Sequence, residues 1–238
     1  GRMAEPEEIA AQLDDFFRQA SALSGKQVLV TAGPTYEAID PVRFIGNHSS
    51  GKMGFAIAEA LANHGARVNL VTGPTQLHTE HPGITVKHVV SSDDMYNACT
   101  QLFPTTDIAV LAAAVADYKP AVVAEQKIKK KDNDMALQLI KTHDIAASLG
   151  KLKHNGQVIV GFALETEQEQ ANAMKKLESK NFDLIVLNSL NDSGAGFGHD
   201  TNKISIIDRK HAIRSFELKN KSEVANDIVD AILKTVHA

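Results

Sequence analysis

The sequence has little of what disulfide-rich or membrane-spanning proteins need. Its 238 residues include no tryptophan and a single cysteine, Cys99, so no disulfide can form within the chain. This excludes a disulfide-stabilised secreted scaffold and fits a reducing compartment such as the cytoplasm. The longest apolar run, residues 108–116, is about half of the ~20 residues that a membrane-spanning helix requires. We therefore expect a cytoplasmic protein with no membrane partner.

The sequence also lacks an excess of positive charge. Lys and Arg number 25 against 29 Asp and Glu, which gives a formal net charge of -4. Nucleic-acid binding needs clustered positive charge, so we expect no nucleic-acid partner unless the charges segregate. The apolar fraction of 43% and the charged fraction of 23% are typical of a folded domain. The length allows one large α/β domain or two small ones, and no internal repeat divides the chain.

The beginning of the sequence differs from the rest. Residues 1–24 resemble a leader or linker, with an acidic helix start around Pro6 and a polar stop after it. The first residue is Gly1 rather than methionine, which suggests a segment taken from a longer protein. We expect the functional domain to span residues 25–238.

Short apolar runs alternate with helical patterns from residue 25 onward. This alternation predicts one doubly wound α/β domain, with a mostly parallel sheet and helices on both faces. The expected strands are residues 27–31, 66–72, 84–90, 107–113, 157–162 and 183–188. The expected helices are residues 53–64, 92–103, 143–149, 167–180 and 222–236. Residues 203–207 and 213–218 predict a late antiparallel hairpin.

Ligands of such sheets bind beyond the carboxyl ends of the strands, so the segments that follow the strands are the candidate sites. The first of them is a strand-to-helix loop of about 20 residues, where 2–6 are usual. In it, Asn47, Ser49 and Ser50 precede Gly51 at the expected start of a helix. They can cap the helix and present hydroxyl and N–H groups to an anion. The alternative is an ordinary Ser-capped helix beneath a loop without a ligand.

The same loop matches a phosphate-binding P-loop only in part. Gly46, Gly51 and Lys52 have the right spacing, but Met53 stands where the motif needs a Ser or Thr that binds magnesium. We therefore reject a P-loop NTPase, and the glycines are too few for a dinucleotide-binding fingerprint.

The segment 112–118, AAAVADY, is the second candidate. Its small side chains allow another molecule to approach the backbone, and the Asp117 carboxylate can meet a sugar hydroxyl, a base or a metal-bound phosphate. Simple helix–sheet packing with a capping Asp explains the same pattern.

Three later features remain open. The run 127–131, KIKKK, is either a solvated face or a flap that binds phosphate. Phe162 can stack on a base beneath a helix that carries Lys176 and Lys180, although a core phenylalanine is the simpler interpretation. The glycine-rich stretch 191–198 is a turn or a place where the backbone approaches a ligand.

Two residue types argue against other chemistry. Cys99 lies on the expected helix 92–103 without a local activating partner, so we expect a buried structural thiol. The ten histidines lack the spacing of a zinc site.

Taken together, three blocks resemble one family. Residues 40–54, DPVRFIGNHSSGKMG, residues 113–118 and residues 127–130 are similar to bacterial phosphopantothenate–cysteine ligase, the synthetase half of the bifunctional coenzyme A biosynthesis flavoprotein. The resemblance runs from about Lys26 to the C-terminus. It implies a Rossmann-like fold and a covalently linked decarboxylase domain upstream, which would carry the FMN.

The resemblance also implies an activity. Members of the family activate the carboxylate of 4'-phosphopantothenate with CTP and magnesium, which gives an acyl-cytidylate and pyrophosphate. The amine of cysteine then displaces CMP and forms phosphopantothenoylcysteine. Catalysis of this kind depends on positioning and charge stabilisation. Family members build the phosphopantothenoyl site across a homodimer interface.

Roles follow from the matched positions. Lys127 would neutralise charge during activation, and Asn47 would hold the acyl-cytidylate for attack by cysteine. The residues expected to bind the nucleotide are Leu111, Ala112, Ala113, Asp117, Lys127, Asp144, Ile145, Phe162, Lys176 and Lys180. Those expected to bind the acyl substrate are Arg43, Asn47, Ser49, Ser50 and Gly51. Asp117 is a possible magnesium ligand.

One departure and two alternatives accompany this interpretation. Where the family commonly has Asn-Pro-Asp-Ile, this chain has THDI at residues 142–145. An NAD(P)-dependent oxidoreductase would need a complete glycine fingerprint and a Tyr-x-x-x-Lys pair, but Val122 stands four residues after Tyr118. A non-catalytic nucleotide-binding module would not need Asn47 and Lys127 together.

Overall fold

The structure is a computed structural model, which describes residues 21–130, 135–165, 167–189 and 200–237. Most of the expected leader 1–24, Lys131 and the glycine-rich stretch 191–198 lie outside these residues. The helices are α2 (Lys52–Asn63), α3 (Ser92–Leu102), α4 (Ile145–Leu152), α5 (Glu169–Ser179) and α6 (Lys221–Val236), with a 3-10 turn at Phe103–Thr105. The main strands are β1 (Gln27–Ala32), β4 (Arg67–Thr72), β5 (Ile84–His88), β6 (Ile108–Leu111), β9 (Val158–Glu165), β10 (Leu184–Ser189), β12 (Ile204–Asp208) and β13 (Ile213–Ser215). Shorter strands are β2 (Tyr36–Ala38), β3 (Phe44–Gly46), β7 (Tyr118–Pro120), β8 (Leu139–Lys141), β11 (Thr201–Asn202) and β14 (Lys219–Asn220).

The central sheet has eight strands in the order β13-β12-β10-β9-β6-β1-β4-β5. Six neighbouring strands run parallel to one another: β10, β9, β6, β1, β4 and β5. β12 runs antiparallel to β10, and β13 runs antiparallel to β12. β1 lies in the middle, with Val28 opposite Val68 of β4 on one side and Ile108 of β6 on the other. This confirms the doubly wound, mostly parallel sheet and the late antiparallel hairpin.

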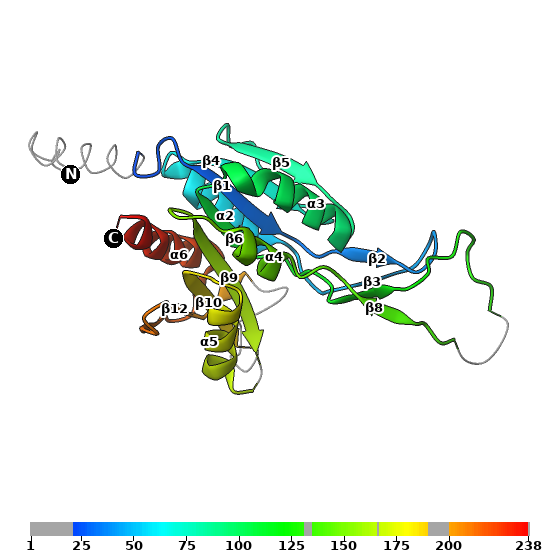
Figure 1. Ribbon diagram of the computed structural model, residues 1–238. Helices are drawn as coiled ribbons and strands as arrows, with labels where there is room; N and C mark the ends of the chain where they lie inside the picture. The colour runs from blue at the N-terminus through cyan, green and yellow to red at the C-terminus, as the bar shows by residue number, and fades with distance from the viewer. Residues whose placement is uncertain (1–20, 131–134, 166, 190–199, 238) are drawn as a thin grey trace, which may run out of the picture.

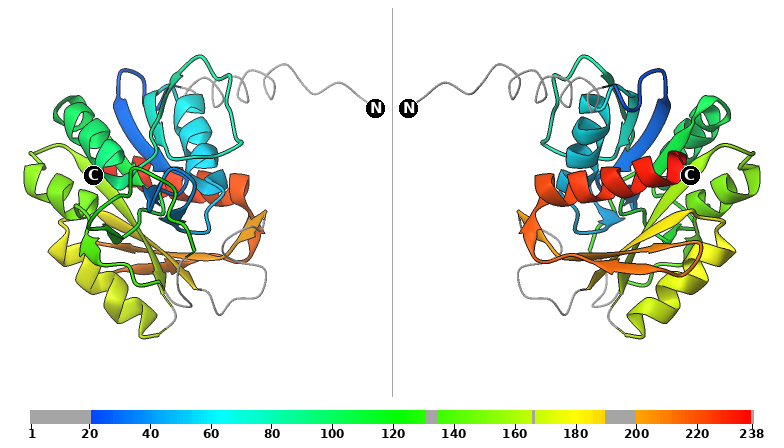
Figure 2. Two further views of the ribbon diagram at one scale, coloured as in Figure 1. Left: turned by 90° about the vertical axis from the view of Figure 1, so that its right-hand side faces the viewer. Right: turned by 90° about the vertical axis from the view of Figure 1, so that its left-hand side faces the viewer.

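Helices cover both faces of this sheet (Figure 2). Val28 and Val30 of β1 belong to the core beneath α2 and α6, whereas Leu29 belongs to the core beneath α3, α4 and α5. Because successive strand residues point to opposite faces, an uninterrupted apolar strand can serve both cores. Cys99 is fully buried in the second core, as expected of a structural thiol.

Two hairpins extend from the sheet and form an arm (Figure 1). β2 pairs with β3 and β7 pairs with β8, both antiparallel, and the described arm comprises residues 36–46, 118–130 and 135–141. The segment between β1 and α2, which we expected to be a loop, therefore contains a hairpin, and this corrects the expectation. Each strand has only three residues, too few for an alternating pattern to stand out. The rings of Tyr36 and Phe44 stack across the hairpin, with their centroids 3.9 Å apart.

The start of α2 also corrects an expectation. No side chain among the described residues caps this helix. Gly51 precedes it with a φ of 81°, and Ser49 Oγ accepts only a long 3.4 Å hydrogen bond from the Gly51 N–H. By contrast, α3 has the capping box of Ser91 and Asp94. The amide groups at the start of α2 are therefore not occupied by a serine cap.

Several boundaries differ from those expected. β9 extends to Glu165 because it pairs with β10 as far as Ser189, so Phe162 lies inside the strand rather than at its expected end. β6 ends at Leu111, β5 ends at His88, and α4 starts at Ile145 after Asp144 as its N-cap.

Candidate functional site

The candidate site lies where the two halves of the sheet diverge. The chain runs from β1 to β4 on one side and from β6 to β9 on the other, so the segments after β1 and β6 face each other at the switch point. The parallel bridge between Pro34 and Ala114 joins them, and the Ala114 N–H donates to Gly33 O at 2.9 Å. Both segments carry residues that the sequence singled out.

The larger cavity has a volume of about 490 Å³ and lies on the α4 and α5 side of this point. Eight of the residues expected to bind a nucleotide line it: Leu111, Ala113, Asp117, Asp144, Ile145, Phe162, Lys176 and Lys180. They come from four segments that are far apart in the sequence, so their convergence is a property of the fold. The volume suits a small-molecule ligand.

Asp117 follows a backbone that two threonine hydroxyls hold in place. The Ala116 N–H donates to Thr35 Oγ1 at 2.9 Å, and Thr142 Oγ1 donates to Ala116 O at 2.7 Å. The Thr142 N–H also donates to Asp117 O at 3.0 Å. Thr35 is fully buried. These bonds fix the peptide groups on both sides of Ala116, and with them the direction of the Asp117 side chain.

Two of the three lysines that line the larger cavity, Lys176 and Lys180, pair with carboxylates. Lys176 Nζ lies 2.6 Å from Glu165 Oε1, and Lys180 Nζ lies 2.9 Å from Asp144 Oδ2. Burial raises the pKa of Asp144, but the Ala147 N–H and Lys180 outweigh it and leave that pKa below its usual value. The two ion pairs thus hold both ammonium groups in the cavity wall.

The smaller cavity, of about 170 Å³, lies at the start of α2. Ser49, Ser50, Gly51 and Ala112 line it, so the structure brings these expected ligand-binding residues together there. The walls of the two cavities share Ala113 and Phe162, which places the cavities next to each other.

Asn47 lies at the same junction and is exposed. Its Nδ2 donates to Ala114 O and to Val115 O, each at 3.1 Å. Because both bonds use the nitrogen, Oδ1 is the atom of this carboxamide that can accept a hydrogen bond from a substrate.

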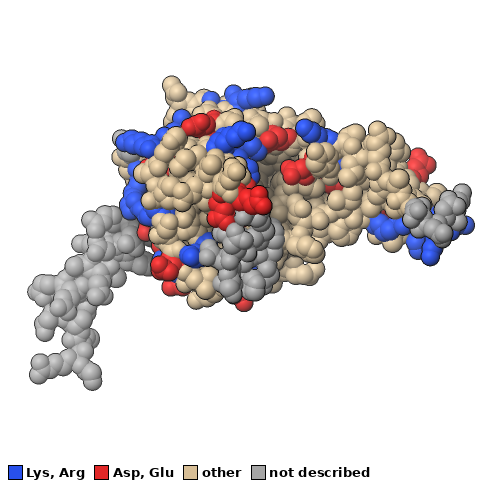
Figure 3. All heavy atoms as spheres, turned by 90° about the horizontal axis from the view of Figure 1, so that it is seen from below, with Lys and Arg blue, Asp and Glu red and all other residues tan. Residues whose placement is uncertain are grey.

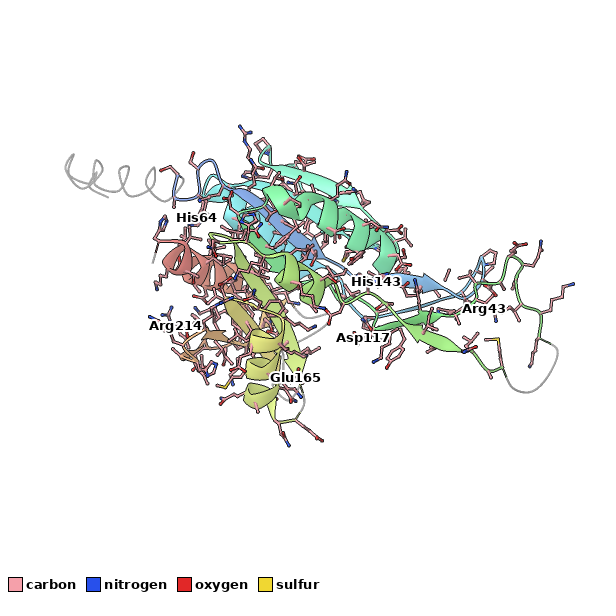
Figure 4. The ribbon with its side chains drawn as sticks, viewed as in Figure 1. Arg43, His64, Asp117, His143, Glu165 and Arg214 are labelled. Atoms are coloured by element: carbon pink, nitrogen blue, oxygen red, sulfur yellow. The ribbon has the colours of Figure 1, made fainter. Side chains whose placement is uncertain are left out.

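Arg43 and Lys127 lie elsewhere, on the arm. Figure 4 shows Arg43 well out along the arm, whereas Asp117 and His143 lie at its base. Arg43 forms an ion pair with the buried Asp40 and donates to Ile128 O at 3.0 Å, next to the exposed Lys127. Within one chain, the structure does not bring these two residues to the cavities.

Asp40 organises this part of the arm. Its carboxylate accepts hydrogen bonds from the N–H groups of Val42 and Ile128, and the Arg43 guanidinium beside it holds the pKa of Asp40 well below its usual range. The exposed Lys127, Lys129 and Lys130 follow, and Figure 3 shows basic side chains gathered at this end of the arm.

Sequence reasoning missed several residues of the site. The ring of His143 stacks on Tyr96 with centroids 4.6 Å apart, and His143 lines the larger cavity. The sequence did carry a signal for His143, because it stands where the family commonly has proline. Thr35 and Glu165 had no signal, because their importance depends on partners distant in sequence.

The described residues contain neither a cluster of metal-binding side chains nor a membrane-spanning helix. Within residues 21–130, 135–165, 167–189 and 200–237, no three or more His, Cys, Asp or Glu side chains are grouped to hold a metal ion. No helix in that same part of the chain has the length and apolarity required to cross a membrane.

Known proteins resemble the chain over nearly its whole length. A relative from an unknown prokaryotic organism, named cysteine/cysteine sulfinic acid decarboxylase, is 52% identical and covers 100% of this chain and 67% of its own. The coenzyme A biosynthesis bifunctional protein CoaBC of Haemophilus influenzae is 46% identical over 98% of this chain. The chain spans 58% of the length of that protein.

A solved structure agrees with these relatives. The crystal structure of the C-terminal domain of a CoaBC protein matches with a TM-score of 0.77 and 39% identity, over 91% of this chain and 98% of that one. A family model described as the C-terminal domain of DNA/pantothenate metabolism flavoproteins matches residues 23–236. The chain therefore belongs to the family of DNA/pantothenate metabolism flavoprotein C-terminal domains.

Proposed function

We propose that the chain is a phosphopantothenate–cysteine ligase that uses CTP. The observation that carries this proposal is the junction of two cavities at the switch point, with Asn47 beside it. The larger cavity offers aromatic rings, two carboxylates and three lysines to a nucleoside. The smaller one offers hydroxyls and the start of a helix to phosphate groups. The similarity to proteins named for coenzyme A biosynthesis supports the same assignment.

In the first step, a carboxylate oxygen of 4'-phosphopantothenate attacks the α-phosphorus of CTP, and pyrophosphate leaves. The bond between the α-phosphorus and its bridging oxygen breaks as the acyl–phosphate bond forms. Lys176 and Lys180 hold the nucleotide, while Phe162 provides a face for the base. Lys127 neutralises the negative charge that gathers on the phosphates, which lowers the barrier through charge stabilisation.

In the second step, the amine of cysteine attacks the acyl carbon, the amide forms and CMP leaves with the bonding electrons. The amine loses a proton to solvent. Asn47 is fixed through Nδ2, so Oδ1 can orient the acyl-cytidylate or the incoming amine. The contribution of Asn47 is positioning, which suits a reaction whose reactants already carry the necessary chemistry.

Magnesium enters with the nucleotide. Its usual protein contacts are one or two carboxylates, with phosphate oxygens and water as the other ligands. Asp117 and Asp144 both line the larger cavity, so the residues fit a metal held in this way. When bound, the metal would neutralise phosphate charge, and Asp117 is the residue that we assign to it.

Arg43 and Lys127 reach the substrates in the cavities only if the arm of one chain meets the cavities of another. We propose a homodimer for this reason. Many exposed apolar side chains of the chain lie on the arm: Val42, Phe44, Tyr118, Val122, Val123, Met135, Leu139 and Ile140. Val122 is 82% exposed. A contiguous apolar patch is typical of an interface.

Mixing two inactive variants tests the shared site. Lys127→Gln removes the arm lysine and Lys176→Met removes a cavity lysine. If Lys127 acts in the partner's site, a mixed dimer contains one intact site and regains activity after subunit exchange. If it acts in its own chain, every site keeps one lesion and the mixture stays inactive. Sedimentation of Val122→Asp, expected to be monomeric, provides the control on assembly.

The half-reactions test the activity itself. Pyrophosphate release with CTP, magnesium and phosphopantothenate should be absent in Lys127→Gln. Asn47→Asp should still release pyrophosphate but form little amide. No pyrophosphate release from the folded wild-type protein would refute the ligase, and equal loss of both half-reactions in Asn47→Asp would refute the role of Asn47.

A different activity is tested alongside these assays. One relative is named as a cysteine or cysteine sulfinic acid decarboxylase, so carbon dioxide release from either compound is measured in parallel, and we expect none.

The CoaBC relatives are longer than this chain, and we propose that an FMN-containing decarboxylase domain is linked to the ligase in the full protein. Since CTP and cysteine are cytoplasmic metabolites, we place the reaction in the cytoplasm.

A further inference from the structure

Two helices begin side by side at the smaller cavity, and both begin with lysine. Lys52 is the first residue of α2 and Lys221 is the first residue of α6, and the two helices pack against each other on one face of the sheet (Figure 2). Both lysines line the smaller cavity. The ribbon of β11 and β14 leads directly into α6 and so fixes where Lys221 lies.

This arrangement concentrates positive charge at the smaller cavity. The start of a helix carries a partial positive charge, so acidic side chains stabilise it and basic ones do not. Here two ammonium groups are added to two such ends. Burial lowers the pKa of Lys221, the charge of Lys52 lowers it further, and Asp200 opposes both effects. Asp200 also forms an ion pair with Lys52 through a carboxylate that is 81% exposed.

Other groups of the cavity suit an anion as well. Ser49 and Ser50 line it, and α2 starts without a side-chain cap. Asn188 Oδ1 is buried in its wall and has no hydrogen-bond partner among the described residues. An ammonium group drawn inward by an anion is a donor that would satisfy this oxygen.

We propose that Lys221, together with Lys52, binds the terminal phosphates of the nucleotide and then the departing pyrophosphate. The inference rests on the proposed ligase function and adds two residues to its site. The larger cavity next to it holds the nucleoside. Because Ala113 and Phe162 line both cavities, the phosphate chain extends from the larger cavity into the smaller one. Positive charge there stabilises the leaving group in the first step.

The experiment compares Lys221→Met with the wild-type protein in calorimetric binding of magnesium–CTP, CMP and inorganic pyrophosphate. Lys234→Met is the matched control, because Lys234 lies in the last turn of the same helix and outside both cavities. We expect Lys221→Met to bind CTP and pyrophosphate about tenfold more weakly and CMP with little change. Lys221→Arg should recover much of the lost affinity.

A second measurement separates binding from folding. Because Lys221 is at an unfavourable helix position, Lys221→Met without ligand should have a Tm equal to or above that of the wild-type protein. A clear fall in Tm would mean that the lysine is structural. Unchanged CTP affinity, or equal weakening of CTP and CMP binding, would each overturn the proposal.

The wild-type controls distinguish this failure from failure of the proposed function. A wild-type protein that does not bind CTP, or binds it without releasing pyrophosphate when phosphopantothenate is present, would refute the ligase and the subsite with it. A wild-type protein that is active while Lys221→Met keeps full CTP and pyrophosphate affinity would refute the subsite alone.

Discussion

The buried hydroxyl oxygen of Thr35 accepts a hydrogen bond from the N–H of Ala116 at 2.9 Å. The two residues lie in the segments that follow β1 and β6, so this bond connects the two sides of the switch point. Ala116 directly precedes Asp117, which lines the larger cavity. Thr35 is therefore a positioning residue for the candidate nucleotide site.

Thr35→Val keeps the shape of the side chain and removes the acceptor. The buried Ala116 N–H is then left unsatisfied, and we expect a loss of about 1–3 kcal/mol in the free energy of unfolding. CTP affinity should also fall, because Asp117 is no longer held in place. Urea denaturation and calorimetry measure the two effects. Thr35→Ser retains the oxygen and should recover most of both losses; a Ser variant as impaired as Val would contradict the positioning role.

Asp40 should make the stability of the arm depend on pH. Its pKa is lowered in the folded protein, first by Arg43 and then by backbone N–H groups. A lowered folded pKa stabilises the protein above the unfolded value of about 3.9, and this contribution is lost as the pH falls towards the folded value. The gap in unfolding free energy between the wild type and Asp40→Asn should be constant from about pH 5 to 8 and shrink below about pH 4. A gap that is unchanged at about pH 3 would show that charge is not its cause.

Lys180 should contribute to nucleotide affinity through its charge. Replacing it with methionine removes a cation from the larger cavity and leaves Asp144 unpaired there. We expect about tenfold weaker CTP binding and a smaller dependence of affinity on salt. Calorimetry at low and high salt measures both. Lys175→Met, an exposed lysine on the same helix, should change neither.

Cys99 should be inert in the folded protein. Burial raises the pKa of its thiol to about 12, so the reactive thiolate is scarce at neutral pH. A thiol reagent at about pH 8 should react with less than a tenth of the protein until denaturant unfolds it. Rapid stoichiometric labelling of the native state would contradict the burial of this residue.

Gly54 should tolerate no side chain. A Cβ there would lie 2.6 Å from Ala32 Cβ and 3.0 Å from Thr31 O, where α2 approaches the end of β1. Gly54→Ala should therefore lose about 1–3 kcal/mol despite the better helix propensity of alanine. Chemical denaturation measures this, with Glu59→Ala on the exposed side of α2 as control. A stabilised Gly54→Ala would show that the helix can shift.

Much of the site was predictable because its residues occur in short contiguous blocks. Asp117 follows β6, Phe162 lies in β9, and Lys176 and Lys180 lie at the end of α5, the helix that follows β9. The carboxyl ends of parallel strands meet at one edge of a sheet, which brings these segments together. Eight of the residues that line the larger cavity were expected to bind the nucleotide. The arm was not expected as a paired structure, because its three-residue strands depend on partners and not on a pattern of their own.

The sequence by itself determined the order of the main helices and strands of the central sheet, the placement of helices on both of its faces and the buried state of Cys99. These follow from local periodicity and from composition, which act over a few residues. Tertiary structure alone decided that Thr35 holds Ala116, that Arg43 and Lys127 lie on the arm, and that Lys52 meets Lys221. Such contacts join segments that chain folding brings together from far apart, and no local pattern carries information about a distant partner.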